Sequence, residues 1–198
     1  MDMLSLDVQV LLVINQGAAN ALFDILMPAL SQRGYLLVLP FLVLMAARSG
    51  QRRDPAGRSF LPLALGTLLV ALTAVCCAEW TEGVLKAAVA RPRPCRVVEG
   101  LRLIVACPQS YSMPSGHAIT SFAGALPLYL LTREYLPLAW RHYPLLLAAA
   151  VAFSRIYLGV HYPSDALAGA LLGSIIGSSF SYLYRWAQAV WSRDRNRT

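Results

Sequence analysis

Long apolar blocks separated by short polar stretches dominate the 198-residue chain. Each of the clearest blocks approaches, with its flanking residues, the roughly 20 residues that a membrane-spanning helix needs. These blocks are residues 35–47, 60–84, 117–131, 143–158 and 166–184. The pattern predicts an all-α fold, a polytopic membrane helical bundle with five to six transmembrane helices.

The first 33 residues give a weaker signal, because polar residues such as Asp7, Asn15 and Asp24 interrupt the apolar run. This segment has neither the basic start nor the small-residue cleavage site of a signal peptide. We expect two short amphipathic pieces, or a re-entrant pair, in the membrane interface. The predicted organisation is an amphipathic N-terminal segment at 1–33, a transmembrane domain at 34–190 and a basic cytoplasmic tail at 191–198.

Composition supports a membrane protein over the other broad classes. The chain is 57% hydrophobic and 14% charged, whereas soluble domains are about 45–50% apolar and roughly 25% charged. A chain of this length cannot bury so much apolar surface in one core. The composition therefore excludes an ordinary soluble globule, a disordered chain and a fibrous repeat.

The positive charge indicates membrane orientation and not nucleic-acid binding. The formal net charge is +7, and all but one of the 17 basic residues are arginines, many of them in short loops. Arginine-rich loops at 48–58 and 133–142, with the C-terminal tail, indicate the cytoplasmic side. The loops at 91–113 and 159–165 then face outward. Four arginines depart from this rule and require a functional reason: Arg91, Arg93, Arg96 and Arg102.

The cysteines fit this topology. Cys95 and Cys107 lie twelve positions apart in the outward loop, where an oxidising compartment favours a disulfide. Metal binding is the weaker alternative, because the chain lacks the close cysteine spacing of zinc sites. Cys76 and Cys77 fall inside a predicted span, and we expect them to be small buried residues.

Three polar patches on the outward side carry the unusual chemistry. Taken singly, each has a structural explanation, such as a snorkelling lysine, a helix start or a structural histidine. Charged side chains in or beside membrane spans are energetically costly. The location of all three patches at one membrane face therefore favours a functional role. The patches are Lys86 to Pro94, Pro114-Ser115-Gly116-His117, and Ser154-Arg155 to His161 and Asp165.

The residue types in these patches suit a phosphate. Lys86, Arg93 and Arg155 are cations, and arginine binds phosphoryl oxygens in a bidentate manner. Ser115 can cap a helix whose free N–H groups attract anions, and Gly116 leaves space for the approach. The chain has neither a Walker-type loop nor a carboxylate cluster for magnesium. We therefore expect protein groups alone to bind the phosphate, with no metal and no cofactor.

Two of the three histidines are candidates for the reaction. His161 stands four residues before Asp165, whose carboxylate can fix the ring tautomer and leave the other nitrogen as a nucleophile. His117 begins a helix beside the expected phosphate site, where it can protonate a leaving oxygen.

At these residues the chain resembles the type-2 phosphatidic acid phosphatase superfamily, with motifs K-x6-R-P, P-S-G-H and S-R-x5-H-x3-D. Every spacing is met, and the resemblance covers about residues 60–185. It implies a metal-independent phosphatase with a phospho-histidine intermediate, in which His161 attacks, Asp165 orients it and His117 protonates the leaving group. The phosphate-binding residues that it implies are Lys86, Arg93, Ser115, Gly116 and Arg155.

The resemblance also implies a substrate, namely a membrane lipid phosphate or diphosphate reached from the periplasmic side of a bacterial inner membrane. The small chain is similar to bacterial undecaprenyl-diphosphate phosphatases, so undecaprenyl diphosphate is the first candidate. Phosphatidylglycerophosphate, phosphatidate and lipid A 1-phosphate are alternatives, and a lipid phosphotransferase would share the first step. A transporter or scaffold would instead spread charges through the depth of the bilayer.

Overall fold

The computed structural model describes residues 3–49 and 61–195, and the part it describes is built from helices without strands. The predicted all-helical class is confirmed for these residues. The longer helices are α1 (Met3–Leu12), α2 (Ala21–Arg33), α3 (Leu39–Ser49), α4 (Leu61–Val89), α6 (Gly116–Thr132), α8 (Tyr143–Tyr157) and α9 (Pro163–Arg195). The short helical turns are η1 (Val13–Gly17), η2 (Gly34–Val38), α5 (Pro94–Val97) and α7 (Leu138–Arg141).

Three stretches of the described residues are long and apolar enough to cross a membrane: Ala21–Arg48, Leu61–Val97 and Pro163–Arg193. The other two predicted spans coincide with α6, which has 17 residues, and α8, which has 15. Both are shorter than the roughly 20 residues of a typical span. The multi-pass character is therefore supported, and the count of five to six spans stays a prediction.

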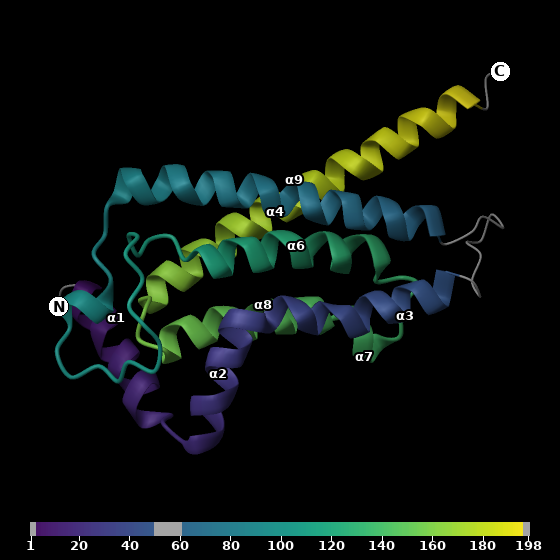
Figure 1. The fold of residues 1–198 in the computed structure, drawn as a ribbon. Coiled ribbons are helices and arrows are strands. Elements are labelled where there is room, and N and C mark those ends of the chain that lie inside the picture. The colour runs from purple at the N-terminus through teal and green to yellow at the C-terminus, as the bar shows by residue number, and fades with distance from the viewer. Residues whose placement is uncertain (1–2, 50–60, 196–198) are drawn as a thin grey trace.

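Helices α2 and α3 form one nearly continuous stretch near the N-terminus. The stretch Ala21–Arg48 continues through the predicted boundary at residue 33, with only the turn η2 between α2 and α3. Figure 1 shows α2 set at an angle to α3 at this turn. The clear break comes earlier, where Asn20 caps α2 by accepting a hydrogen bond from the backbone N of Phe23 at 2.9 Å.

Helix α6 lies between α4, α8 and α9 (Figure 1) and contacts all three. The glycines of α9 allow the closest of these contacts, because small residues let two helix backbones approach each other. A Cβ added to Gly173 would lie 2.2 Å from the backbone O of Ile119, and one on Gly169 would lie 2.7 Å from that of Ser115. The first turns of α6 and α9 are thereby fixed side by side.

The far end of α9 also differs from the sequence division. The helix continues to Arg195, so the basic tail expected from residue 191 begins inside a helix. In Figure 1 this last part of α9 projects beyond the other helices.

The four cysteines fall into two pairs. Cys95 and Cys107 are joined by a disulfide, with their Cα atoms 6.0 Å apart, so the bond closes the loop that follows α5. Cys76 is exposed and Cys77 is partly exposed. The expectation that both are buried is wrong, because their face of α4 points away from the neighbouring helices.

The Cys95–Cys107 bond should measurably stabilise the outer loop. Closing a loop of this length contributes about 2–3 kcal/mol in the chain-entropy model, so Cys95→Ser should lower the thermal midpoint in detergent. Cys76→Ser, which changes a free and exposed cysteine, is the matched control and should leave the midpoint unchanged. Mass spectrometry of unreduced native protein checks the bond directly, and alkylation of both thiols would refute it.

Candidate active site

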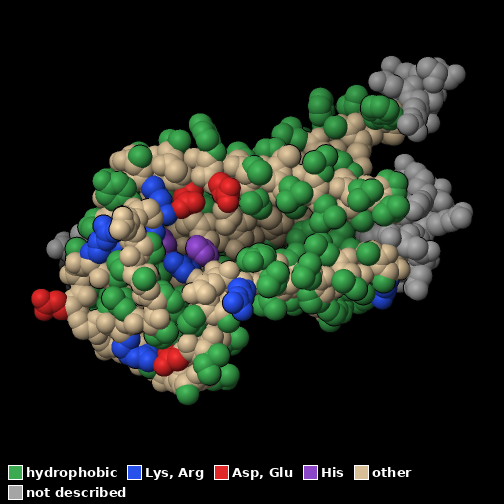
Figure 2. Space-filling model, in the orientation of Figure 1, with side chains coloured by type: hydrophobic (Ala, Val, Ile, Leu, Met, Phe, Trp, Pro, Cys, Tyr) green, Lys and Arg blue, Asp and Glu red, His purple; other side chains and the backbone are tan. Residues whose placement is uncertain are grey.

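One end of the helical bundle brings the three polar patches together. The connection between α4 and α6 and the turn between α8 and α9 meet at one end of the bundle (Figure 1), where the backbone N of Ser115 donates to the backbone O of Asp165 at 3.0 Å. Figure 2 shows histidine side chains inside a hollow at this end, flanked by basic and acidic side chains. Hydrophobic side chains cover much of the remaining helical surface in that view.

His161 is held as a neutral ring whose Nε2 faces Arg93. Its side chain is buried, and its Nε2 lies 2.9 Å from Nη1 of Arg93. A guanidinium only donates hydrogen bonds, so Nε2 accepts and the ring proton sits on Nδ1. Burial, reinforced by the charges of Arg93 and Arg155, lowers the pKa of His161 to about 4, although Asp165 acts in the opposite direction. The ring is therefore unprotonated at neutral pH and can act as a nucleophile.

Asp165 lies beside His161, but the expected direct hydrogen bond is absent. Nδ1 of His161 is 3.5 Å from Oδ2 of Asp165, which is longer than a hydrogen bond. Three other donors bind the fully buried carboxylate instead: Nη1 of Arg91 at 2.7 Å, the backbone N of Tyr162 at 2.9 Å and the hydroxyl of Ser112. The carboxylate is thus fixed independently of the imidazole, with its negative charge facing the protonated Nδ1.

Arg91 and Asp7 are site residues that the sequence motifs missed. Nη2 of Arg91 donates to Asp7 at 2.8 Å while its Nη1 holds Asp165, and its guanidinium lies 3.9 Å from the ring centre of Tyr162. Asp7 also accepts from the backbone N of Ser164 at 2.9 Å. Helix α1 is thereby tied to the turn that carries His161 and Asp165. The sequence offered one indication of this pair, because Arg91 departs from the positive-inside pattern and Asp7 interrupts an apolar segment. The two residues are 84 positions apart.

Two of the expected phosphate ligands are buried with polar atoms unused. Ser115 occupies the N-cap position of α6, but its fully buried hydroxyl makes no cap bond, so that expectation is wrong. The Ser115 Oγ and Arg155 Nε atoms have no hydrogen-bond partner among the described residues. Arg155 is 7% exposed, and its Nη1 donates to the hydroxyl of Ser31. Buried polar atoms of this kind require an explanation, and a bound anion would satisfy both.

Arg93 is positioned by the backbone around the site. Its Nε donates to the carbonyl of Ser110 at 2.7 Å, and its Nη1 donates to the carbonyl of Val160 at 2.9 Å. The side chain is only 3% exposed. It therefore presents a fixed positive charge beside His161.

Lys86 reaches the same end of the bundle from α4. Its Nζ lies 2.5 Å from Oε1 of Glu82 on the preceding turn. The Glu82 carboxylate rests against the start of α6, where a Cβ on Gly116 would meet it at 2.2 Å. Gly116 is needed for this close approach, as the sequence indicated, although the group that approaches here is a carboxylate.

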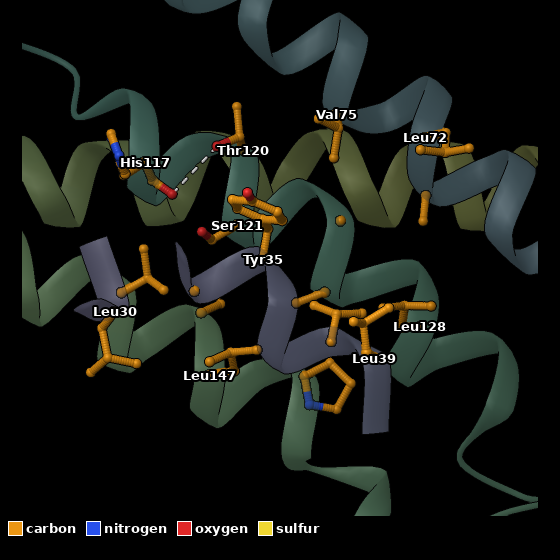
Figure 3. Close-up of a pocket in the computed structure, with 18 of the residues that line it drawn as sticks. Leu30, Tyr35, Leu39, Leu72, Val75, His117, Thr120, Ser121, Leu128 and Leu147 are labelled. Carbon is orange, nitrogen blue, oxygen red and sulfur yellow. Dashed lines mark hydrogen bonds between the residues drawn. The ribbon is translucent and has the colours of Figure 1, made fainter. Parts of the chain in front are cut away.

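His117 marks the junction between the polar site and an apolar cavity. The cavity has a volume of about 550 Å³ and is lined by residues of α2, η2, α3, α4, α6 and α8. Figure 3 shows His117 at one end and Leu39, Leu72 and Leu128 toward the other. A polar group beside His117 could therefore continue into an apolar chain between the helices.

The four arginines that depart from the positive-inside pattern all have hydrogen-bond partners at this end of the bundle. Besides Arg91 and Arg93, Arg96 donates to the carbonyl of Pro108 at 2.9 Å, and Arg102 binds Asp24 at 2.7 Å. Asn15 accepts from the backbone N of Arg102 at 2.9 Å. Arg91 and Arg93 thus contact the turn that carries His161 and Asp165, and Arg96 and Arg102 bind the loop between α4 and α6 and the N-terminal helices.

Comparison with known proteins identifies the class. The PAP2 superfamily model matches residues 65–189, so the chain belongs to this superfamily. It is similar to an undecaprenyl-diphosphatase of Sulfolobus acidocaldarius, at 39% identity over 46% of this chain and 42% of that protein. It is also similar to a decaprenylphosphoryl-5-phosphoribose phosphatase of Mycobacterium tuberculosis, at 44% identity over 36% of each chain. The aligned part thus spans less than half of these curated relatives.

A solved structure agrees on the fold. The transmembrane PAP2-type phosphatidylglycerolphosphate phosphatase of Bacillus subtilis superposes with a TM-score of 0.65 over 90% of this chain and 84% of that one. The two sequences are 22% identical. The likeness therefore concerns the fold alone.

Removing Arg91 should affect catalysis more than binding. Because Arg91 holds Asp165 opposite His161, Arg91→Gln should lower kcat about 10- to 100-fold through misplacement of the catalytic pair, with little change in KM. Arg91→Lys keeps the charge and should recover part of the loss. Arg96→Gln changes an exposed arginine of the same loop and serves as the control. Equal kinetics for Arg91→Gln and Arg96→Gln would contradict the positioning role, as would a defect confined to KM.

Proposed function

We propose that the protein is a membrane phosphatase that hydrolyses a lipid phosphate through a phospho-histidine intermediate on His161. The observation that carries this proposal is the neutral, buried His161, with its Nε2 turned to Arg93. The unused buried atoms of Ser115 and Arg155 support an anion site. The family match supports phosphoryl chemistry.

The reaction follows from the positions of the two histidines. Nε2 of His161 attacks phosphorus, and the bond from phosphorus to the leaving oxygen breaks as the new N–P bond forms. His117, in the protonated form that a bound phosphate anion favours, gives its proton to that oxygen. In the second step, water attacks the phospho-histidine, His117 takes the water proton, and His161 is released with inorganic phosphate. Asp165 faces Nδ1 and stabilises the positive charge that develops on the ring.

The proposed phosphate ligands supply the positive charge for this chemistry. Lys86, Arg93 and Arg155 stabilise the phosphoryl oxygens, and Ser115 with the backbone at Gly116 adds donors at the start of α6. These groups carry the reaction in the proposed mechanism without a metal ion or another cofactor.

The cavity beyond His117 supports a lipid as the substrate. Its walls include Leu68, Leu72 and Leu128, and an apolar cavity between helices suits a hydrocarbon chain. We place the site on the periplasmic side of a bacterial inner membrane, because the arginine-rich loops indicate that the opposite ends are cytoplasmic.

The particular lipid is a separate part of the proposal. Undecaprenyl diphosphate remains a candidate, and the Sulfolobus relative carries that activity in its name. The Mycobacterium relative is named as a decaprenylphosphoryl-5-phosphoribose phosphatase, which keeps phosphatidylglycerophosphate among the candidates. Phosphatidate and lipid A 1-phosphate are the other two candidate substrates.

A phosphate-release assay on purified protein tests the function. We expect inorganic phosphate from at least one of four lipids, namely undecaprenyl diphosphate, phosphatidate, phosphatidylglycerophosphate and lipid A. Because protein cations carry the charge stabilisation, release should persist in excess EDTA and be inhibited by vanadate, which mimics five-coordinate phosphorus. Dependence on added magnesium after chelation would contradict this mechanism. Phosphate release that requires an acceptor alcohol would show a phosphotransferase instead.

Substitutions of the two histidines should lower activity in different ways. His161→Ala should abolish turnover of every substrate, because the covalent intermediate cannot form. His117→Ala should lose up to about 10⁴-fold on a lipid substrate, whose alkoxide needs a proton, and much less on p-nitrophenyl phosphate, whose phenolate leaves unaided. His142→Ala, at the far end of α8, is the control. Equal losses for His117→Ala and His161→Ala on both substrates would refute these roles, as would labelled phosphate trapped on His117.

A further inference from the structure

One face of α4 changes from charged to apolar side chains between the phosphate site and the apolar cavity. Lys86, Glu82, Glu79, Val75 and Leu72 follow one another at spacings of three and four residues, which places them on a single helix face. Glu82, which pairs with Lys86, reaches the start of α6, while Glu79, Val75 and Leu72 line the cavity with His117. A lipid phosphate along this face would therefore pass two carboxylates between its phosphoryl group and its tail.

The position of Glu82 sets the charge of the phosphate site. Its carboxylate pairs with Lys86 at 2.5 Å and rests against Gly116, the first residue of α6. The fully buried, unpartnered hydroxyl of Ser115 immediately precedes this glycine, which independently indicates an anion there. Among the proposed phosphate ligands, Glu82 therefore offsets one of three positive charges, while Arg91 is already paired with Asp7 and Asp165. A lipid diphosphate carries more negative charge than a phosphomonoester, so this carboxylate disfavours the diphosphate more.

Glu79 is an exposed carboxylate in the wall of the apolar cavity. It lines the same cavity as His117, and His117 is the proposed donor to the leaving oxygen. In a lipid diphosphate that oxygen is bonded to a second phosphoryl group. The oxygens of this group carry negative charge, and the group would enter the cavity beside Glu79. Like charges repel each other there, and solvent at the exposed Glu79 screens part of the repulsion. In a phosphomonoester the same position holds an uncharged carbon. Figure 2 shows acidic side chains at the edge of the hollow that contains the histidines.

We propose that Glu82 and Glu79 are specificity-determining residues that select lipid phosphomonoesters over lipid diphosphates. The inference rests on the proposed phosphatase function and narrows its substrate class. It ranks the phosphomonoester lipids above undecaprenyl diphosphate, the first candidate from the sequence. The selection is electrostatic, so neutral isosteres should remove it without altering the cavity.

Farnesyl phosphate and farnesyl diphosphate provide a matched pair of probes, because they share one tail and differ only in the second phosphate. We expect the unaltered protein to have the higher kcat/KM for farnesyl phosphate. Glu79→Gln and Glu82→Gln should each shift the ratio of the two values toward the diphosphate by about tenfold, equivalent to roughly 1.4 kcal/mol. Glu99→Gln, an exposed carboxylate of the outer loop, should leave the ratio unchanged.

The outcomes distinguish failure of the selectivity proposal from failure of the proposed phosphatase function. Failure of the unaltered protein on both probes and on the four lipids would overturn both proposals. A higher kcat/KM of the unaltered protein for farnesyl diphosphate would overturn the selectivity alone. Equal changes of kcat/KM for both probes in the glutamine variants would also overturn it. A second measurement needs no variant: inorganic phosphate should inhibit hydrolysis of p-nitrophenyl phosphate more strongly than pyrophosphate does, and the reverse order would overturn the inference.

Discussion

The close approach of α6 and α9 is the constraint on which the site depends. Gly169 and Gly173 have no side chains to separate the two backbones, so the helices begin side by side and Ser115 donates its backbone N–H to Asp165. This contact brings two segments about fifty positions apart to one place. His117 belongs to the first turn of one helix, and His161 lies just before the other. A larger side chain at either glycine would move one histidine relative to its partner.

The charged groups at this end form pairs that stabilise one another. Arg91 would be costly so near the membrane without Asp7 and Asp165, and each acid would be costly without Arg91. Arg102 and Asp24 make a second pair that binds the outer loop to α2. The N-terminal helices therefore contribute directly to the geometry of the site, although they lie outside the region that matches the family model.

The sequence predicted the helical class and the residues that meet at the outer end, because motif spacing and helix periodicity are local properties. It did not reveal the pairing of Arg91 with Asp7, which depends on how α1 folds back onto the turn before α9. It also predicted a direct bond between His161 and Asp165 from their spacing alone. Competing donors from Arg91, Ser112 and Tyr162 decide where that carboxylate points, and two of these come from the loop between α4 and α6.

Arg93 links the resting arrangement to the proposed reaction. Its Nη1 donates both to the carbonyl of Val160 and to Nε2 of His161, the nitrogen that must attack phosphorus. The lone pair of Nε2 cannot accept from Arg93 and bond to phosphorus at once. A phosphoryl oxygen is a stronger acceptor than a neutral imidazole, because it is charged. Substrate can therefore take over this donor and free Nε2, while the carbonyls of Ser110 and Val160 keep the guanidinium in place. In the proposed mechanism, binding of the phosphate and release of the nucleophile are thus one event.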